Sequence, residues 1–281
     1  MTRRNQFLEI YSKFLQQFLK PQKPLKVIFD CSNGTAGLVL KKLLKPKTPA
    51  LPAGRQNLKP IFINEKPDGN FPAINQLRAA VKKNKADLGV IFDGDADRAL
   101  FVDNKSHFID SDAIARLLIW HLRPKKIVID VRVGWLLRNL KIIESQVGHP
   151  FIEKKIVSEQ ADLGFEHSGH YYFKKFFYLD SGILAALEVI NAVSRLPYKF
   201  SDFVDLLPRY YRQEINFPLN QLKYKTPASL SKRFGGLRKE FSDYWFNFHF
   251  SQTEPLLRLD IEAVDKPQLQ KQILKFKKIL L

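Results

Sequence analysis

The sequence is poor in several residue types, and each shortage excludes a class of protein. Cys31 is the only cysteine, which excludes an internal disulfide and fits a cytoplasmic protein. No apolar run is long enough to cross a membrane. The basic N-terminal stretch lacks the apolar core and the small-residue cleavage site of a secretory signal. We therefore expect a cytoplasmic protein without a membrane partner.

Acidic residues are also scarce relative to basic ones. The 281 residues include 46 lysines and arginines against 28 aspartates and glutamates, a formal net charge of +18. The basic residues fall in short scattered pairs, such as Lys41-Lys42 and Lys277-Lys278, a pattern more typical of solvated helix faces than of a nucleic-acid site. We predict no nucleic-acid partner. Nucleic-acid binding stays a remote alternative, which salt-sensitive retention on heparin would reveal. The positive field favours anionic ligands, including phosphates.

Strands and helices alternate along most of the chain, whose composition of 45% hydrophobic and 26% charged residues is that of a soluble globular protein. Apolar runs predict strands at 25–30, 60–64 and 87–92. Helical spacing is found at 11–19, 38–45 and 74–84, and the same rhythm returns from residue 112. This alternation predicts α/β layers with largely parallel strands. The aromatic-rich stretch after Leu207 ends as a strand and a helix, which indicates a small α+β unit.

Three aspartates mark the end of one apolar strand. Asp93, Asp95 and Asp97 alternate directly after the run DLGVIF and are followed at once by Arg98. Three like charges so close together are costly unless a positive group lies among them. A short set of carboxylates that leaves room for water and a phosphate oxygen suits Mg2+. The pattern predicts a magnesium site, since a plain solvated acidic turn would need no apolar strand beneath it.

Two other motifs compete for this stretch. An EF-hand loop starting at Asp93 requires glycine at its sixth position and glutamate at its twelfth. This chain has Arg98 and Asn104 there, which excludes an EF-hand. A phosphatase of the haloacid-dehalogenase type also ends a strand in two aspartates separated by one residue. It normally has threonine or valine where this chain has Asp97, and it is kept as a minor alternative.

The loop FDGDADR resembles the metal-binding loop of the α-D-phosphohexomutases, the superfamily of phosphoglucomutase and phosphomannomutase. Further stretches resemble the same family in the same order: LKVIFDCSNGTAG, PDGNFP, VGHPFIEKK, EHSGHYYFKKFFYLDSGILAAL and SQTEPLLRLDIEA. The resemblance covers nearly the whole chain. It implies two consecutive α/β/α phosphohexomutase-type domains followed by a small α+β C-terminal domain. The division that we predict is a linker helix at 1–24, a metal-binding domain at 25–104, a sugar-binding domain at 105–206 and a phosphate-binding domain at 207–281.

The resemblance implies phosphoryl transfer to and from sugar phosphates. In this family a phosphoserine exchanges its phosphoryl group with a hexose monophosphate through a hexose bisphosphate. Mg2+ is held by the serine phosphate and by the three loop aspartates. Arg98 would contact the phosphoryl group in transit, although a salt bridge that relieves the aspartates explains this residue equally well. His149 and Arg132 match positions near the reacting hydroxyl, where the family uses a general acid or base and an electrostatic partner.

Other matching positions would bind the substrate. In EHSGH the family uses the glutamate and the serine to hold sugar hydroxyls, and these are Glu166 and Ser168 here. Gly169 would let the backbone come close to the sugar. The family usually has glycine before this glutamate, where this chain has Phe165.

The fourth domain of the family binds the phosphate that is not transferred. Backbone N–H groups and hydroxyls make a good anion cradle, and the matching residues are Ser251, Gln252 and Thr253. The family motif begins with arginine, whereas this chain has His249 before the loop, so a bidentate phosphate contact is lost. Arg258 is expected to support the fold.

The reactive serine of the family lies in a first domain, within a serine-histidine-asparagine-proline segment that this sequence does not contain. The only Ser-His pair, Ser106-His107, falls in a turn after the metal loop. The resemblance therefore predicts a truncated chain that is inactive alone. Its serine-bearing domain would either be supplied by a separate polypeptide as a partner or have been lost with an upstream coding segment.

Two functions from different classes follow. The first is a phosphohexomutase that interconverts hexose 1-phosphate and hexose 6-phosphate with Mg2+, and that binds hexose phosphates and hexose bisphosphate. The second is a non-catalytic sugar-phosphate-binding protein. The three aspartates favour the first, because a pure binder has no use for a three-carboxylate metal site. Phe165 and His249 favour the second.

Overall fold

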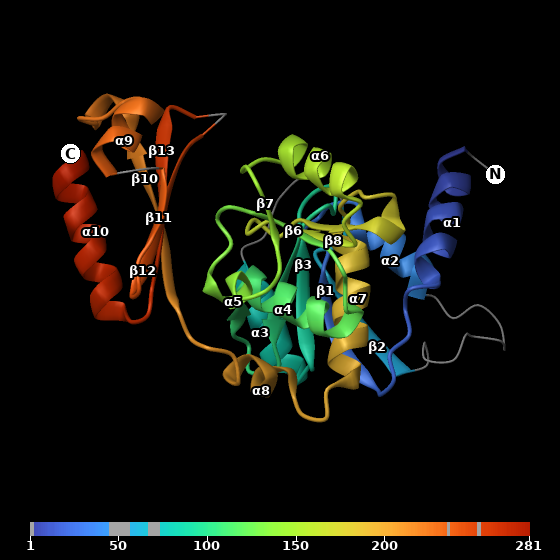
Figure 1. The fold of residues 1–281 in the computed structure, drawn as a ribbon. Coiled ribbons are helices and arrows are strands. Elements are labelled where there is room, and N and C mark those ends of the chain that lie inside the picture. Colours follow the sequence, from blue (N-terminus) through green and yellow to red (C-terminus); the bar gives the residue numbers. More distant parts are fainter. Residues whose placement is uncertain (1–2, 45–56, 67–73, 235–236, 252–253) are drawn as a thin grey trace. The chain divides into compact units, whose positions relative to one another are not determined.

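The computed structural model describes residues 3–44, 57–66, 74–234, 237–251 and 254–281. The chain divides into two compact units between Leu207 and Pro208 (Figure 1). The first unit contains two sheets and the second contains one. PDGNFP, one of the stretches that resemble the family, lies outside the described residues. None of the helices within the described ranges is long and apolar enough to span a membrane.

The first sheet has the strand order β2-β1-β3-β4-β5. Its strands are β1 (Leu25–Asp30), β2 (Leu58–Ile63), β3 (Leu88–Phe92), β4 (Ala99–Asp103) and β5 (Phe108–Ile109). β1 pairs in parallel with β2 and β3, whereas β4 and β5 add in antiparallel orientation. Every residue of β3 is buried. The aspartates that follow it stand where this central strand reaches solvent.

The second sheet has the strand order β7-β6-β8-β9. Its strands are β6 (Ile127–Asp130), β7 (Ile143–Ser145), β8 (Leu163–Phe165) and β9 (Tyr171–Phe173). β6 pairs in parallel with β7 and β8, and β9 returns antiparallel to β8. The two sheets therefore share one plan, in which a parallel centre ends in an antiparallel edge. This mixed pattern agrees with the predicted α/β class.

Eight α-helices accompany the two sheets in the described part of the first unit. They are α1 (Arg3–Gln16), α2 (Ala36–Leu44), α3 (Ile74–Asn84), α4 (Ser111–Leu122), α5 (Trp135–Arg138), α6 (His149–Glu159), α7 (Gly182–Arg195) and α8 (Phe200–Asp205). α1 packs beside α2 (Figure 1). α7 is buried from Gly182 to Ser194 and contacts β3, β4 and α4. One cluster of buried side chains includes residues of both sheets and of α7, so the two sheets share a hydrophobic core.

The second unit is an antiparallel sheet with the strand order β10-β13-β12-β11. Its elements are β10 (Tyr211–Pro218), α9 (Pro227–Phe234), β11 (Arg238–Glu240), β12 (Tyr244–Phe250), β13 (Leu256–Ala263) and α10 (Lys266–Leu280). α10 packs against β13 and β10 (Figure 1), and its first turn is capped by the Asp265 carboxylate, which accepts from Gln268 N at 2.7 Å. The unit has its own hydrophobic core.

The sequence predicted most of these elements, but one helix was placed wrongly. The helix expected at 11–19 spans Arg3–Gln16. It ends early because the backbone that follows is held by α7: Lys20 N donates to Asn191 Oδ1 at 2.7 Å, and Asn191 Nδ2 donates to Phe18 O at 2.6 Å. A contact between residues so distant in sequence leaves no local signal. The helix predicted at 74–84 is confirmed. The predicted boundary between residues 104 and 105 stays a prediction.

Candidate active site

The three aspartates lie together on one short loop, here called the aspartate loop (Asp93–Arg98). One carboxylate oxygen from each of Asp93, Asp95 and Asp97 lies within 4.8 Å of the others. Ala96 adopts a left-handed backbone conformation with φ of 66°, an uncommon one for a residue with a side chain. The chain therefore bends sharply between Asp95 and Asp97, and the bend brings the carboxylates to one place.

Close backbone contacts hold this loop on two sides. On one side, Thr35 N donates to Gly94 O at 2.9 Å, and a Cβ atom on Gly34 would lie 2.4 Å from the same oxygen. On the other side, Gly182 N donates to Ala96 O at 3.1 Å, and a Cβ on Gly182 would lie 2.4 Å from Arg98 O. Only glycine allows both approaches. The position of the aspartates is thus fixed by backbone contacts with the turn after β1 and with the start of α7.

Charge on the loop is partly balanced by Arg98. Its Nε lies 2.5 Å from an Asp93 carboxylate oxygen and 3.8 Å from an Asp97 oxygen. Burial alone would raise the pKa of Asp93, but hydrogen bonds with Asp97 and Arg98 lower it below its usual value. Burial, together with the neighbouring Asp93, raises the pKa of Asp97 to about 6. Among the described residues, none forms a hydrogen bond with the buried Oδ1 of Asp97. A buried carboxylate oxygen without a donor, beside two other carboxylates, fits a hard cation.

The EHSGH motif forms the hairpin between β8 and β9, here called the EHSGH hairpin (Glu166–His170). Glu166 N donates to His170 O and Gly169 N donates to Glu166 O, both at 3.0 Å. Ala99 N in turn donates to Gly169 O at 3.2 Å, so the hairpin is bonded to the strand that follows the aspartate loop. Gly169 has φ of 94°, and a Cβ there would lie 3.0 Å from a Leu100 methyl carbon. The positive φ favours glycine here whether or not a sugar approaches.

Phe165, the departure from the family pattern, lies in the core and not in the hairpin turn. It is buried, and its ring packs against Tyr171 with centroids 5.9 Å apart. Its neighbour Gly164 is the tightly packed position, because a Cβ there would lie 2.2 Å from Ile156 Cδ1.

Glu166 is the centre of a buried polar network. Its Oε1 accepts from the Tyr172 hydroxyl at 2.5 Å, and its Oε2 lies 3.5 Å from Arg132 Nη2. Arg132 is held by Asp130, whose Oδ2 accepts from Nη2 at 2.7 Å. The Tyr172 hydroxyl also lies 3.0 Å from His149 Nδ1. Three residues that the sequence predicted separately, namely Arg132, His149 and Glu166, are therefore joined in one network.

Two histidines meet at Asp180. His170 Nδ1 lies 2.6 Å from an Asp180 carboxylate oxygen, and His149 Nδ1 lies 3.5 Å from the same oxygen. Burial alone would lower the pKa of His170, but the hydrogen bond to Asp180 and the charges of Glu166 and Asp97 raise it above its usual value. His170 Nδ1 is also 3.9 Å from an Asp97 oxygen. His170 therefore lies between the aspartate loop and the network around Glu166.

Sequence reasoning missed His170, Tyr172 and Asp180. His170 stands inside the EHSGH motif, so a signal for it was present. Asp180 and Tyr172 carry no such signal. An antiparallel bridge between Asp180 and Tyr172 of β9 brings Asp180 back to the histidines.

A cavity of about 310 Å³ opens beside the aspartate loop. Its polar lining comes from Ser32, Asp93, Arg98 and Ser168, and the remaining lining residues are apolar. Ser168 of the hairpin therefore faces the same space as Asp93 and Arg98. The structure brings these predicted site residues together.

The predicted phosphate loop lies in the second unit. Ser251 N donates to Leu256 O at 2.9 Å, and Ser251 Oγ accepts from Glu254 N at 3.2 Å. Gln252 and Thr253, the other two predicted contacts, lie outside the described residues. His249 Nδ1 is 3.5 Å from an Asp260 oxygen. Arg258 is 2.9 Å from a Glu254 oxygen, and its predicted support of the fold stays a prediction.

The sequence matches two domains of one protein family. Phosphoglucomutase/phosphomannomutase, alpha/beta/alpha domain II, matches residues 6–106. Alpha/beta/alpha domain III of the same family matches residues 110–210.

Curated relatives show the same similarity. A phosphomannomutase of Methanocaldococcus jannaschii is 30% identical over 97% of this chain and 65% of its own length. A phosphomannomutase of Escherichia coli is 32% identical over 87% of this chain and 60% of its own length. The chain thus spans less than two thirds of the length of these relatives.

Solved structures share the fold. A phosphoglucomutase/phosphomannomutase family protein of Burkholderia thailandensis superposes with a TM-score of 0.77 at 22% identity, covering 97% of this chain and 63% of that one. N-acetylphosphoglucosamine mutase of Aspergillus fumigatus, in complex with GlcNAc-6P and magnesium, gives a TM-score of 0.67 at 17% identity, covering 94% and 62%.

The Glu166 network leads to a prediction about stability. Tyr172→Phe should lower the free energy of unfolding by about 1–3 kcal/mol, because a buried carboxylate oxygen loses its hydroxyl donor. Equilibrium urea unfolding measures this. Tyr198→Phe is the matched control, since Tyr198 is 38% exposed, and it should change stability by less than about 0.5 kcal/mol. Equal stability of the two variants would show that the hydrogen bond from Tyr172 to Glu166 does not stabilise the fold.

Proposed function

Because this chain belongs to the phosphoglucomutase/phosphomannomutase family of the α-D-phosphohexomutase superfamily, we propose that it is the metal-binding and sugar-binding part of a phosphohexomutase. The reaction would interconvert hexose 1-phosphate and hexose 6-phosphate by phosphoryl transfer. One observation carries the proposal: the EHSGH hairpin is hydrogen-bonded to Ala99, the residue directly after the aspartate loop, through Ala99 N and Gly169 O. The aspartate loop, which would neutralise phosphoryl charge, therefore lies next to the EHSGH hairpin, which would bind sugar hydroxyls.

Hexose phosphates and hexose bisphosphate are the proposed substrates. The Aspergillus fumigatus mutase, whose fold is similar, has been solved in complex with GlcNAc-6P and with glucose 1,6-bisphosphate. In this chain Ser168 lines the cavity beside Asp93 and Arg98. A sugar hydroxyl held by the hairpin would therefore lie near the groups that neutralise a phosphoryl charge.

Mg2+ is the proposed cofactor, held by Asp93, Asp95 and Asp97. Their clustered oxygens support this assignment, as does the buried Oδ1 of Asp97, which accepts no hydrogen bond from the described residues. When bound, the ion would neutralise charge on phosphoryl oxygens.

The surrounding side chains have distinct proposed roles. Arg98 uses Nε on Asp93 and has further N–H groups that can donate to a phosphoryl oxygen. His149 is 43% exposed and shares Asp180 with His170, so we assign it the exchange of a proton with the reacting hydroxyl. Arg132, held by Asp130, keeps positive charge beside Glu166.

The phosphoryl group needs an enzyme oxygen as its carrier, and no serine of this sequence stands in a serine-histidine-asparagine-proline segment. A serine-bearing domain is the proposed partner. It would also complete the cleft and help to exclude water.

A non-catalytic sugar-phosphate-binding protein is the second candidate. His249 replaces the arginine with which the family's phosphate motif begins, and its ring is directed to Asp260. Without the guanidinium a bidentate phosphate contact is lost, which weakens the case for efficient turnover.

Metal binding gives the next prediction. Calorimetric titration with Mg2+ or Mn2+ should detect weak binding, and Asp95→Asn should weaken it at least about tenfold, because one ligand charge is lost. Asp87→Asn removes the same charge from the other end of β3 and should leave metal binding unchanged. Equal binding by wild type and Asp95→Asn would refute the assignment.

Sugar binding can be tested at the hairpin. Glu166→Ala should weaken binding of glucose 1-phosphate by about 1.5–3 kcal/mol, and Ser168→Ala by about 1 kcal/mol, since hydrogen bonds to a charged group are stronger. Glu166→Gln keeps an acceptor for the Tyr172 hydroxyl but removes the charge. It therefore distinguishes weaker binding through lost charge from weaker binding through a disturbed fold. Unchanged titrations for all three variants would make the EHSGH hairpin a purely structural loop.

Turnover is the direct test of the function. With Mg2+ and glucose 1,6-bisphosphate, the chain alone should not convert glucose 1-phosphate to glucose 6-phosphate. Addition of a separately expressed, phosphorylated serine domain from a relative should produce turnover that Asp95→Asn removes. Activity of the chain alone, after contaminating host mutases have been removed, would contradict the proposal. Binding of sugar phosphate without turnover in the mixture would favour the non-catalytic function.

A further inference from the structure

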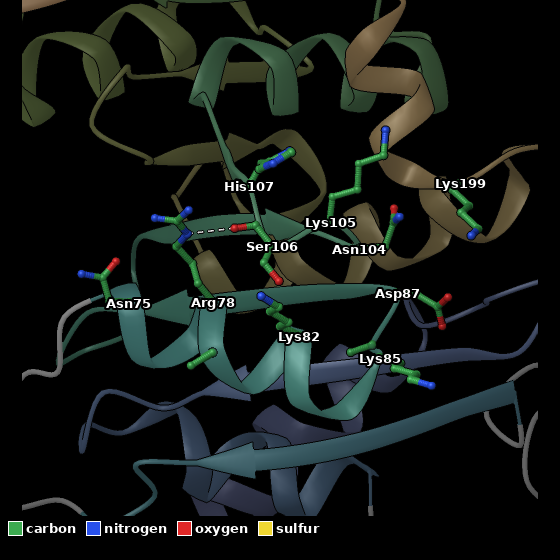
Figure 2. Close-up of a pocket in the computed structure, with 12 residues that line it drawn as sticks. Asn75, Arg78, Lys82, Lys85, Asp87, Asn104, Lys105, Ser106, His107 and Lys199 are labelled. Carbon is green, nitrogen blue, oxygen red and sulfur yellow. Dashed lines mark hydrogen bonds between the residues drawn. The ribbon is translucent and has the colours of Figure 1, made fainter.

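A second cavity of the first unit lies along α3 and has a volume of about 640 Å³ (Figure 2). One wall is α3 and the residues that follow it, up to Asp87. The other wall is the turn between β4 and β5, with Lys199 before α8. This cavity, here called the α3 groove, shares no lining residue with the cavity beside the aspartate loop. Asp87 and Asp93 flank the two ends of β3, which places these residues roughly 20 Å apart.

The α3 groove is strongly cationic. Its lining includes Arg78, Lys82, Lys85, Lys105 and Lys199, against the single carboxylate of Asp87. Lys105 is paired with Asp205 at 2.9 Å. For Lys82, Lys85 and Lys199, the described part of the chain provides no acidic partner within ion-pair distance. Unbalanced cations that line a concave surface attract and concentrate anions.

The walls of the groove are fixed by hydrogen bonds. Arg78 Nε donates to Ser106 O at 2.8 Å and so bridges the two walls (Figure 2). The turn is tied to α8, because Asn104 Oδ1 accepts from Ser201 N at 2.9 Å. Figure 2 shows the ends of Lys82 and Ser106 pointing toward each other across the groove. The bridging bond uses only one N–H of the Arg78 guanidinium, so the planar group is held in place with donors to spare for a ligand.

The lining also indicates the kind of anion. Among the described lining residues none is phenylalanine, tyrosine or tryptophan, so the groove offers no large aromatic ring on which a nucleic-acid base could stack. Its volume is that of a small-molecule site. Cations occur on both walls, which suits a ligand with more than one anionic group. We propose that the α3 groove binds a small anion carrying two or more phosphate groups, at a site separate from the aspartate loop.

Calorimetric titration with pyrophosphate and with orthophosphate, at low ionic strength and without divalent metal, tests this. Pyrophosphate should bind about tenfold more tightly than orthophosphate, because it reaches both walls. Lys82→Gln combined with Lys199→Gln should lower pyrophosphate affinity at least about tenfold. Both lysines are exposed, and thermal melting should confirm an intact fold. Lys82→Arg combined with Lys199→Arg should retain the affinity within about threefold, since the charges remain.

The matched control is Lys275→Gln combined with Lys278→Gln, two exposed lysines of α10 in the other unit. It removes the same charge and should change pyrophosphate affinity by less than about twofold. Equal losses in the two glutamine pairs would attribute binding to the diffuse positive field and overturn the proposal. Loss on Arg98→Gln, with none on the Lys82 and Lys199 pair, would place binding at the aspartate loop instead. Tighter binding of a single-stranded RNA oligomer, which pyrophosphate fails to displace, would also overturn it.

Discussion

The candidate site depends on close backbone packing around the aspartate loop. Three carboxylates on one loop repel each other, and the loop keeps its shape because Gly94 O and Ala96 O accept hydrogen bonds from Thr35 and Gly182. Both contacts need glycine, at 34 and at 182, where a Cβ would lie 2.4 Å from a carbonyl oxygen. Within this loop, burial and the neighbouring Asp93 raise the pKa of Asp97, and Arg98 bonds to Asp93.

The site belongs to both sheets of the first unit. The aspartate loop follows β3 of the first sheet, whereas the EHSGH hairpin connects two strands of the second. Ala99 and Gly169 join them through the backbone, and His170 lies 3.9 Å from an Asp97 oxygen. α7 supports the arrangement, because its buried length packs on the first sheet while its first residue holds the aspartate loop. A substitution in the core beneath α7 would therefore displace the aspartate loop.

Basic side chains are paired with carboxylates at one site of this chain and lack acidic partners among the described residues at another. Beside the aspartate loop, Arg98 and His170 both lie within ion-pair distance of carboxylates. In the α3 groove, Lys82 and Lys199 have no such partners among the described residues. Within a chain of net charge +18, positive groups are thus paired with carboxylates at the aspartate loop. In the α3 groove Lys82 and Lys199 are not, so this surface attracts anions.

The sequence by itself determined the class of fold, the place of the aspartates at the end of a buried strand, and the family, because apolar periodicity and short motifs are local properties of the chain. It also predicted Arg98, His149 and Glu166 as site residues, and the structure joins His149 and Glu166 through Tyr172. It misplaced the first helix, whose end is set by Asn191 on α7. It missed Asp180 and Tyr172, and it read the scattered lysines as solvated faces without finding the α3 groove. Only the tertiary structure decided these features, because each requires residues far apart in sequence to meet, and the pairing of distant strands and helices is set by the packing of the whole core.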